Sequence, residues 1–124
     1  MAKVLVIDDD ANLLNLLRIF LTKMGWTTPV AKTGAEGLRL AREEKPDIIL
    51  CDVNLPDLDG LQIARNLRAM PECARTPLVL ITGARKEAES VIAGLDGGAQ
   101  GYLLKPVDLR LVHAKLEAVL KAGK

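Results

Sequence analysis

Residues 47–60 read DIILCDVNLPDLDG. This stretch begins as a short apolar run, reaches Asp52, and continues into a loop of asparagine, proline, aspartate and glycine. A continuously apolar run bounded by turn-forming residues is typical of a strand covered on both faces. We therefore expect a central strand over residues 47–51 that delivers Asp52 to an open loop.

Four more short apolar runs alternate with longer segments that repeat apolar residues at helical spacing. The expected strands cover residues 3–7, 26–31, 47–51, 78–81 and 101–104. The expected helices cover residues 11–24, 61–70, 86–95 and about 108–121, with another that opens at Thr33. Because each parallel connection must cross the sheet, this alternation favours a parallel sheet with helices on both faces. Residues 1–124 should thus form one doubly wound α/β domain.

The second expected strand differs from the other four, which are almost wholly apolar. It carries Thr27, Thr28 and Pro29. Proline has no N–H to donate to a strand ladder, so this strand should lie at an edge of the sheet. The other four have the composition of strands covered on both faces.

The ends and faces of two helices can also be predicted. Asp10 is expected to cap the first helix, and Thr33 and Glu36 have the spacing of a reciprocal capping box at the second. The first helix should bury one apolar stripe, formed by Leu13, Leu16, Leu17, Phe20 and Met24.

Composition limits the class of protein. The chain has 124 residues, 49% of them hydrophobic, and a net charge of +1. These figures fit one globular domain and exclude the strongly basic footprint of a general nucleic-acid binder, while a protein partner stays open. The apolar runs are too short to span a membrane and no signal peptide is visible, so we expect a cytoplasmic protein. Cys51 and Cys73 match no zinc spacing or disulfide framework and are expected to be reduced thiols.

Polar residues follow four of the expected strands, at the edge where parallel strands open into a crevice. They are Asp8, Asp9 and Asp10 after the first strand, Asp52 after the third, Thr82 after the fourth and Lys105 after the fifth. Distant parts of the chain should therefore bring carboxylates, a hydroxyl and an ammonium to one edge of the sheet.

This combination of groups suits phosphoryl chemistry. Closely packed carboxylates repel, and a hard divalent cation such as Mg²⁺ removes the conflict while leaving positions for water and a phosphoryl oxygen. With Lys105 and Thr82 nearby, such a site can stabilise a phosphoryl group in transfer. Asp52 is the best candidate for the acceptor, because it ends the central strand beside an open loop.

Taken together, these motifs resemble the receiver domains of response regulators in bacterial two-component systems, such as the chemotaxis regulators. Residues 4–10, VLVIDDD, look like the family's first strand and acid pair, and residues 52–60, DVNLPDLDG, match its phosphoacceptor loop. Residues 82–84, TGA, and 102–106, YLLKP, complete a resemblance that covers nearly the whole chain. It implies a flavodoxin-like fold with strand order 2-1-3-4-5 and a cis peptide bond between Lys105 and Pro106.

The resemblance also implies a role for each site residue. Asp52 would be phosphorylated from a sensor histidine kinase or a phosphotransfer protein. Asp9 and Asp52 would bind Mg²⁺ directly, Asp8 would act through a water molecule, and Asn54 would contribute its backbone carbonyl. Asp10 is left over, and its expected role is helix capping or a favourable charge in the first turn of the helix, as opposed to metal binding.

Three further residues would read and transmit the modification. Thr82 would hydrogen-bond to the phosphoryl group, Lys105 would pair with it, and Tyr102 would change rotamer on activation. The fourth helix has the poorest apolar stripe, formed by Val91, Ile92 and Leu95 around an internal Gly94. We therefore expect the signal to be read on the face of the fourth helix, fifth strand and fifth helix.

Two other functions compete with this interpretation. A receiver-like module could act without phosphorylation. A phosphatase of the haloacid dehalogenase type would need an acid two residues past its nucleophile, where this chain has Asn54. The favoured interpretation is a domain that is no enzyme beyond its own phosphorylation and dephosphorylation. Trp26 and His113, the latter on the polar side of the last helix, are expected to be structural.

The output is not specified by the sequence. An unknown output domain or partner protein, or a phosphorylation-dependent homodimer, stays open. Direct contact of this chain with nucleic acid or a membrane is not expected.

Overall fold

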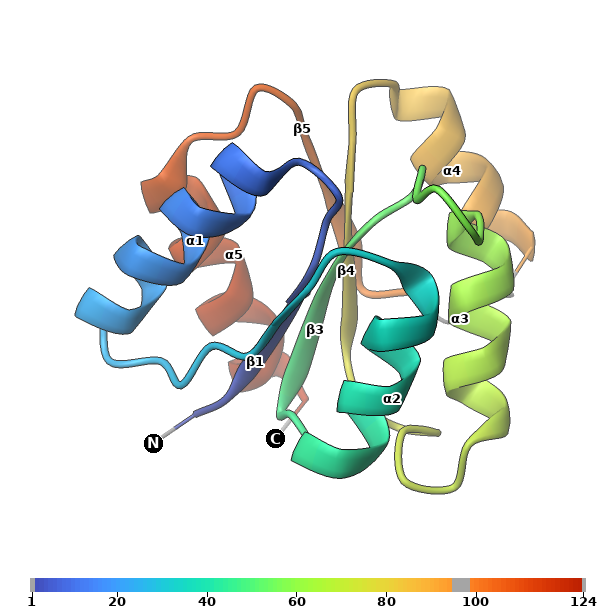
Figure 1. The fold of residues 1–124 in the computed structure, drawn as a ribbon. Coiled ribbons are helices and arrows are strands. Elements are labelled where there is room, and N and C mark those ends of the chain that lie inside the picture. The colour runs from blue at the N-terminus through green and yellow to red at the C-terminus, as the bar shows by residue number, and fades with distance from the viewer. Residues whose placement is uncertain (1, 95–98, 124) are drawn as a thin grey trace.

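The computed structural model describes residues 2–94 and 99–123. Its elements are β1 Val4–Ile7, α1 Ala11–Lys23, β2 Val30–Ala31, α2 Gly34–Glu44, β3 Ile48–Asp52, α3 Gly60–Ala69, β4 Leu78–Thr82, α4 Arg85–Gly94, β5 Gly101–Leu104 and α5 Leu109–Ala122 (Figure 1). The strands form one parallel sheet in the order β2-β1-β3-β4-β5, which confirms the expected fold. The expected end of α4 at Leu95 lies outside the described residues.

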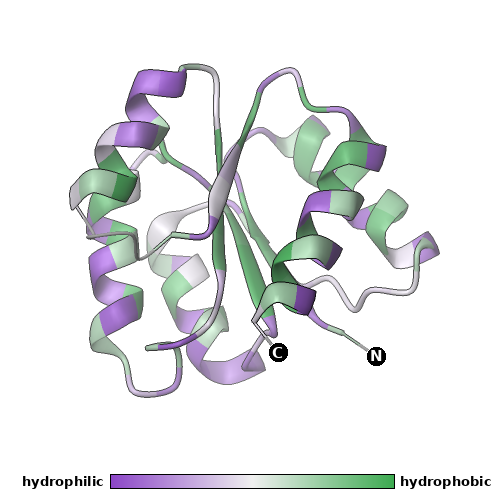
Figure 2. Ribbon diagram, turned by 180° about the vertical axis from the view of Figure 1, so that it is seen from behind, coloured by the Kyte–Doolittle hydropathy of each residue, from purple (hydrophilic) through white to green (hydrophobic). Residues whose placement is uncertain are grey.

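The sheet separates two hydrophobic cores, because successive side chains of a strand point to opposite faces. On β1, Val4 and Val6 join the core beneath α1 and α5, while Leu5 and Ile7 join the core beneath α2, α3 and α4. Figure 1 shows these two helix layers on either side of the sheet, and Figure 2 shows the strongly hydrophobic strands between them. The complete burial of β1, β3 and β4 confirms the expectation for these strands.

The two edge strands depart from the predicted pattern. β2 lies at an edge, as Pro29 indicated, but it is only two residues long, with an isolated bridge between Lys3 and Thr27 before it. The prediction over residues 26–31 was therefore too long. β5 was expected to be buried on both faces, yet it is half-buried and Leu104 is exposed, because β5 pairs only with β4.

Polar side chains cap the N-termini of α1, α2 and α3. Asp10 accepts hydrogen bonds from the backbone N–H groups of Asn12 and Leu13, which confirms it as the cap of α1. Thr33 caps α2, but Glu36 accepts from Lys32 N–H, so the predicted reciprocal box is incomplete. The complete capping box occurs at α3.

The box at α3 is formed by Asp59 and Gln62. Gln62 N–H donates to the Asp59 carboxylate at 2.8 Å, and Asp59 N–H donates to the Gln62 side chain at 3.0 Å. It holds the end of the loop that follows β3.

The buried stripe of α1 is rotated from the one predicted. Leu14, Leu17 and Leu21 are buried, whereas Leu16 is 54% exposed and Met24 is 47% exposed. Leucines stand at adjacent positions 13 and 14 and again at 16 and 17. Two stripes at helical spacing were therefore available, and only packing against the sheet selects between them.

The two cysteines and the one histidine pack against other parts of the fold. Cys51 and Cys73 are free and buried; Cys73 lies in the connection between α3 and β4, where its thiol contacts Ala41 O at 3.5 Å. His113 was expected on the polar side of α5, but it is half-buried and accepts a 2.9 Å hydrogen bond from the Trp26 indole. Trp26 is buried, as expected of a packing residue.

Two further observations complete the backbone description. The peptide bond between Lys105 and Pro106 is cis, as predicted. Within residues 2–94 and 99–123, no helix combines the length and the apolar character needed to cross a membrane.

Candidate functional site

Buried polar side chains gather at the carboxyl edge of the sheet. Asp8 is 0% exposed, Asp52 is 4% exposed and Thr82 is 1% exposed, and no other polar residue of the described chain is buried to this degree. Each follows or ends a fully buried strand. Burying a polar or charged group is unfavourable unless it is paired, so their clustering marks a candidate site.

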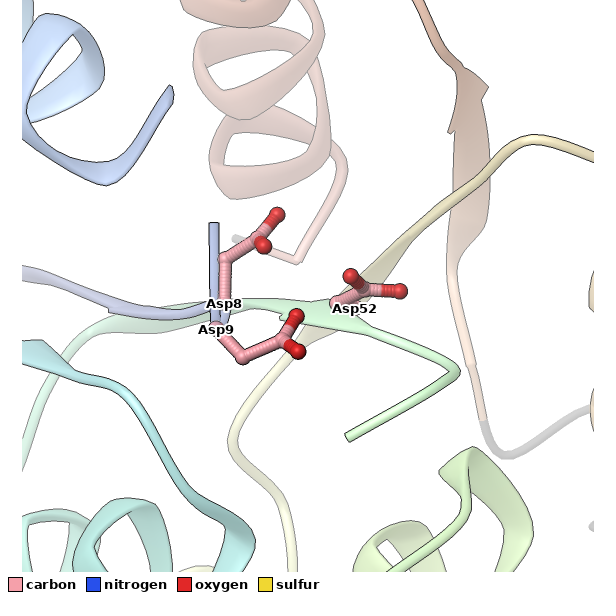
Figure 3. Close-up of side chains that lie close together, drawn as sticks. All are labelled: Asp8, Asp9 and Asp52. Carbon is pink, nitrogen blue, oxygen red and sulfur yellow. The ribbon is translucent and has the colours of Figure 1, made fainter. Parts of the chain in front are cut away.

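Three carboxylates form the centre of this site. Asp8, Asp9 and Asp52 each offer an oxygen, and these atoms lie within 4.8 Å of one another. Figure 3 shows their side chains side by side at the ends of β1 and β3. Parallel pairing of these strands, with Ile7 opposite Cys51, places the acids of both at one edge.

Lys105 supplies positive charge to the two buried acids. Its ammonium donates to Asp52 Oδ2 at 2.9 Å and lies 3.2 Å from Asp8 Oδ2. The backbone N–H of Lys105 donates to Thr82 O at 2.8 Å, which continues the pairing of β4 and β5 beyond the strands. The lysine therefore reaches the acids from the end of β5, as the sequence predicted.

Backbone N–H groups hold the other oxygens of these acids. Asp10 N–H donates to Asp8 Oδ1 at 2.9 Å, and Asn54 N–H donates to Asp52 Oδ1 at 3.0 Å. Asp8 Oδ2 is buried and makes no hydrogen bond with any described residue, although Lys105 is near. Asp8 Oδ2 therefore has the Lys105 ammonium as an ionic partner but accepts no hydrogen bond within the described residues.

The electrostatics of the site follow from burial and from like charges. Burial raises the pKa of Asp8, and the charge of Asp52 adds to this effect; Asp10 N–H and Lys105 oppose it. Burial alone would lower the pKa of Lys105, but the hydrogen bond to Asp52 and the charges of Asp52 and Asp8 outweigh it and raise that pKa. The site therefore favours added positive charge.

These residues fit a hard divalent cation. The donors are all carboxylate oxygens, they outnumber the single ammonium of Lys105, and the buried Asp8 Oδ2 is free of hydrogen bonds in the described structure. Mg²⁺ prefers oxygen ligands and retains water in part of its coordination sphere. Asp9 is exposed, which leaves an open side for such ligands.

Thr82 and Asn54 lie beside this centre and share a partner that the sequence analysis missed. Thr82 Oγ1 lies 3.1 Å from Glu87 Oε1, and Asn54 Nδ2 donates to Glu87 Oε2 at 2.7 Å. Glu87 stands in the first turn of α4. The available signal was an acidic residue in the first turn of the helix that follows the Thr82 strand. Such an acid is also common there because it interacts favourably with the helix dipole, so it did not indicate a site.

Asp57 is a second missed residue. Its carboxylate accepts from Ala35 N–H at 2.9 Å and from Gly34 N–H at 2.8 Å, which joins the loop after Asp52 to the start of α2. These two hydrogen bonds lower the pKa of Asp57. A Cβ at Gly34 would lie 2.8 Å from a Leu58 methyl group, so the close approach requires glycine there.

Tyr102 does not join the polar cluster. It lies half-buried on β5, opposite Leu80 of β4, and packs against the core beneath α2, α3 and α4. Its expected role as a switch therefore depends on movement transmitted from the neighbouring strand, and stays a prediction.

A comparison with known protein families finds a match over most of the chain. The family model described as the response regulator receiver domain matches residues 4–117. The chain belongs to this family. Transcriptional regulatory protein AfsQ1 of Streptomyces coelicolor is 38% identical over 99% of this receiver domain and 53% of its own length. The receiver domain spans about half the length of the curated relatives it matches.

Solved structures share the fold of the receiver domain. Chemotaxis response regulator CheY4 of Vibrio cholerae superimposes with a TM-score of 0.84 and 28% identity, over 96% of this chain and 98% of its own. The receiver domain of sensor histidine kinase PA1611 from Pseudomonas aeruginosa has a TM-score of 0.85 over 97% of this chain and 98% of its own. At 24% identity it shows the fold alone; its structure has a magnesium ion in the active site cleft.

Proposed function

We propose that this receiver domain accepts a phosphoryl group on Asp52 from a phosphohistidine of a sensor histidine kinase or phosphotransfer protein. The observation that carries the proposal is the placement of the Asp52 carboxylate. It is buried at the end of the central strand, paired with Lys105, and adjacent to two further carboxylates. A carboxylate held in this way is positioned to react while its neighbours neutralise developing charge.

The transfer step follows from these groups. A carboxylate oxygen of Asp52 attacks phosphorus, and the P–N bond to the donor histidine breaks. The imidazole nitrogen keeps the electron pair of that bond and takes a proton. The backbone N–H of Asn54, which donates a hydrogen bond to Asp52 Oδ1, keeps the carboxylate oriented during the attack. Later hydrolysis by water returns Asp52 to a carboxylate and releases inorganic phosphate.

Mg²⁺ would be held by Asp9 and Asp52 directly, by Asp8 through water, and by the backbone carbonyl of Asn54. When bound, it supplies positive charge that neutralises the phosphoryl oxygens. The fit of the site rests on the three convergent carboxylates and the buried Asp8 Oδ2. The ion in the PA1611 receiver gives this assignment a parallel in another protein.

Lys105 and Thr82 would stabilise the product. Lys105 would pair with the phosphoryl oxygens from the end of β5, and the Thr82 hydroxyl would donate a hydrogen bond to one of them from the end of β4. Movement of Thr82 toward the phosphoryl group would make room for Tyr102 to turn inward, which reshapes the face formed by α4, β5 and α5. The phosphoryl group would thereby shift a population between two packings.

The position two residues past Asp52 argues against a phosphatase acting on other substrates. Such an enzyme needs an acid there, whereas Asn54 has an amide that donates to Glu87. The domain would therefore act only on its own aspartate. We place this activity in the cytoplasm, where the two free thiols would stay reduced.

The relatives indicate the kind of output. They include transcriptional regulatory protein AfsQ1 of Streptomyces coelicolor and alkaline phosphatase synthesis transcriptional regulatory protein PhoP of Bacillus subtilis, of which this chain spans 53% and 48%. We propose that this receiver likewise controls transcription through an output domain or partner that binds its α4, β5 and α5 face. A phosphorylation-dependent homodimer through that face is one form of such a partner.

The test is phosphorylation by a small acyl phosphate in the presence of Mg²⁺, followed by intact-mass measurement. We expect one phosphoryl adduct that hydroxylamine removes. Asp52→Asn should abolish it, whereas Glu43→Gln, which removes an exposed acid on α2, should leave it unchanged. Persistence of the adduct in Asp52→Asn would overturn the assignment, and its absence in the unaltered protein would favour a receiver that acts without phosphorylation.

A further inference from the structure

Glu87 connects two segments that the proposed chemistry treats separately. Its Oε1 lies 3.1 Å from the Thr82 hydroxyl at the end of β4, and its Oε2 accepts a 2.7 Å hydrogen bond from the Asn54 side chain in the loop after β3. One half-buried carboxylate on α4 therefore bridges both segments.

The bridge occupies the hydroxyl that the phosphoryl group would need. Thr82 Oγ1 accepts from Ala84 N–H at 3.1 Å, and its single proton has two acceptors within reach, Ala84 O at 3.2 Å and Glu87 Oε1 at 3.1 Å. A carboxylate is a stronger acceptor than a backbone carbonyl. In this structure the Thr82 proton is thus committed on the side of α4.

Asn54 brings Glu87 close to the acceptor. The same residue donates its backbone N–H to Asp52 Oδ1 at 3.0 Å and its side-chain amide to Glu87. Phosphorylation adds negative charge at Asp52. The added charge would repel the Glu87 carboxylate and attract the Thr82 proton, so both effects act against the bridge.

We propose that Glu87 is a positioning residue that holds Thr82 and α4 in the resting arrangement and competes with the phosphoryl group for the Thr82 hydroxyl. The inference rests on the proposed function of Asp52. Forming the activated state then requires breaking two hydrogen bonds to one carboxylate. Their loss would release the first turn of α4 from the loop after β3, which links the chemistry to the face that α4 helps to form.

The test uses beryllofluoride, a stable mimic of the phosphoryl group, titrated into the Mg²⁺-loaded protein. Glu87→Gln keeps the side-chain size but removes the charge, and should tighten beryllofluoride binding roughly three- to tenfold, as expected for weakening a charge-assisted hydrogen bond. Glu89→Gln, two positions along the same helix and exposed, is the matched control and should bind as the unaltered protein does. Glu87→Ala should shift the affinity in the same direction and serves if Glu87→Gln folds poorly.

Two readouts separate positioning from a general structural effect. In a Thr82→Val background, which lacks the contested hydroxyl, most of the effect of Glu87→Gln should disappear. The side-chain amide resonance of Asn54 should move on beryllofluoride binding in the unaltered protein, and should already lie near the shifted position in unliganded Glu87→Gln.

Failure of this inference is distinguishable from failure of the proposed function. If neither the unaltered protein nor any variant binds beryllofluoride or forms the Asp52 adduct, the proposed function is wrong and this inference falls with it. If the unaltered protein binds but Glu87→Gln, Glu87→Ala and Glu89→Gln all match it, Glu87 has no such role. An equal effect of Glu87→Gln with and without the Thr82 hydroxyl would also overturn the proposal.

Discussion

The interior of the sheet and its carboxyl edge are one residue apart and have opposite chemistry. Residues 48–51 of β3 are apolar and buried, whereas the next residue is the buried carboxylate of Asp52. The same change occurs from Ile7 to Asp8 and from Ile81 to Thr82. The interior is stabilised by burial, while the edge keeps buried charges that need Lys105 and backbone N–H groups.

Stability therefore resides mainly in the interior and function at the edge. Substitutions in the interior should lower stability, whereas at the edge the removal of a carboxylate should stabilise the metal-free protein and the removal of Lys105 should destabilise it.

Leu50→Ala should have the largest effect. Leu50 is fully buried in the core beneath α1 and α5, and its truncation should lower the free energy of unfolding by about 3 kcal/mol through lost burial and a cavity. Leu111→Ala on α5, where the leucine is 61% exposed, should change it by less than about 0.5 kcal/mol. Equal losses in urea denaturation of the two variants would contradict the assigned core.

Lys105→Met should have the next largest effect, because it leaves Asp8 and Asp52 without their shared cation. We expect a loss of about 1–3 kcal/mol in the metal-free protein, less than for a fully buried pair because the lysine is partly exposed. Mg²⁺ should restore more stability to this variant than to the unaltered protein. Lys86→Met, an exposed lysine on α4, is the control. Indifference of Lys105→Met stability to Mg²⁺ would count against a cation site at these acids.

Asp57→Ala tests the anchor of the loop after Asp52 and should act through pH. Because the folded-state pKa of Asp57 lies below the ordinary value of 3.8, its hydrogen bonds stabilise the fold above that pH. This contribution is lost as pH falls through the lower, folded-state pKa. The thermal midpoint of Asp57→Ala should therefore be lower at neutral pH and approach that of the unaltered protein in acid. A midpoint difference that stays constant with pH would show that the carboxylate is not the stabilising group.

Asp9→Asn should have the smallest effect on stability and the opposite sign. Removing one exposed carboxylate from the cluster should relieve repulsion and stabilise the metal-free protein by about 0.5 kcal/mol. It should also abolish the rise in thermal midpoint that Mg²⁺ produces in the unaltered protein. A magnesium response equal to that of the unaltered protein would remove Asp9 from the proposed ligands.

Much of the fold and the central acids could be predicted because their signals are local. Apolar runs mark the buried strands, and the residue after each run must lie at the same edge of a parallel sheet. The predicted buried stripe of α1 was wrong because two leucine stripes competed. The predicted second strand was too long because an edge strand forms few ladder hydrogen bonds. Glu87 and Asp57 were missed because each has a hydrogen-bond partner more than 20 residues away in the sequence. Gly34, which donates to Asp57, is separated from it by 23 residues.

The central claim is that Asp52 itself forms the acyl phosphate. Borohydride reduces an aspartyl phosphate to homoserine, which marks the modified position permanently. After treatment with a small acyl phosphate and Mg²⁺, peptide sequencing should find homoserine at position 52 and aspartate still at Asp8 and Asp9. Homoserine at either of those positions, or unmodified aspartate at position 52, would contradict the account.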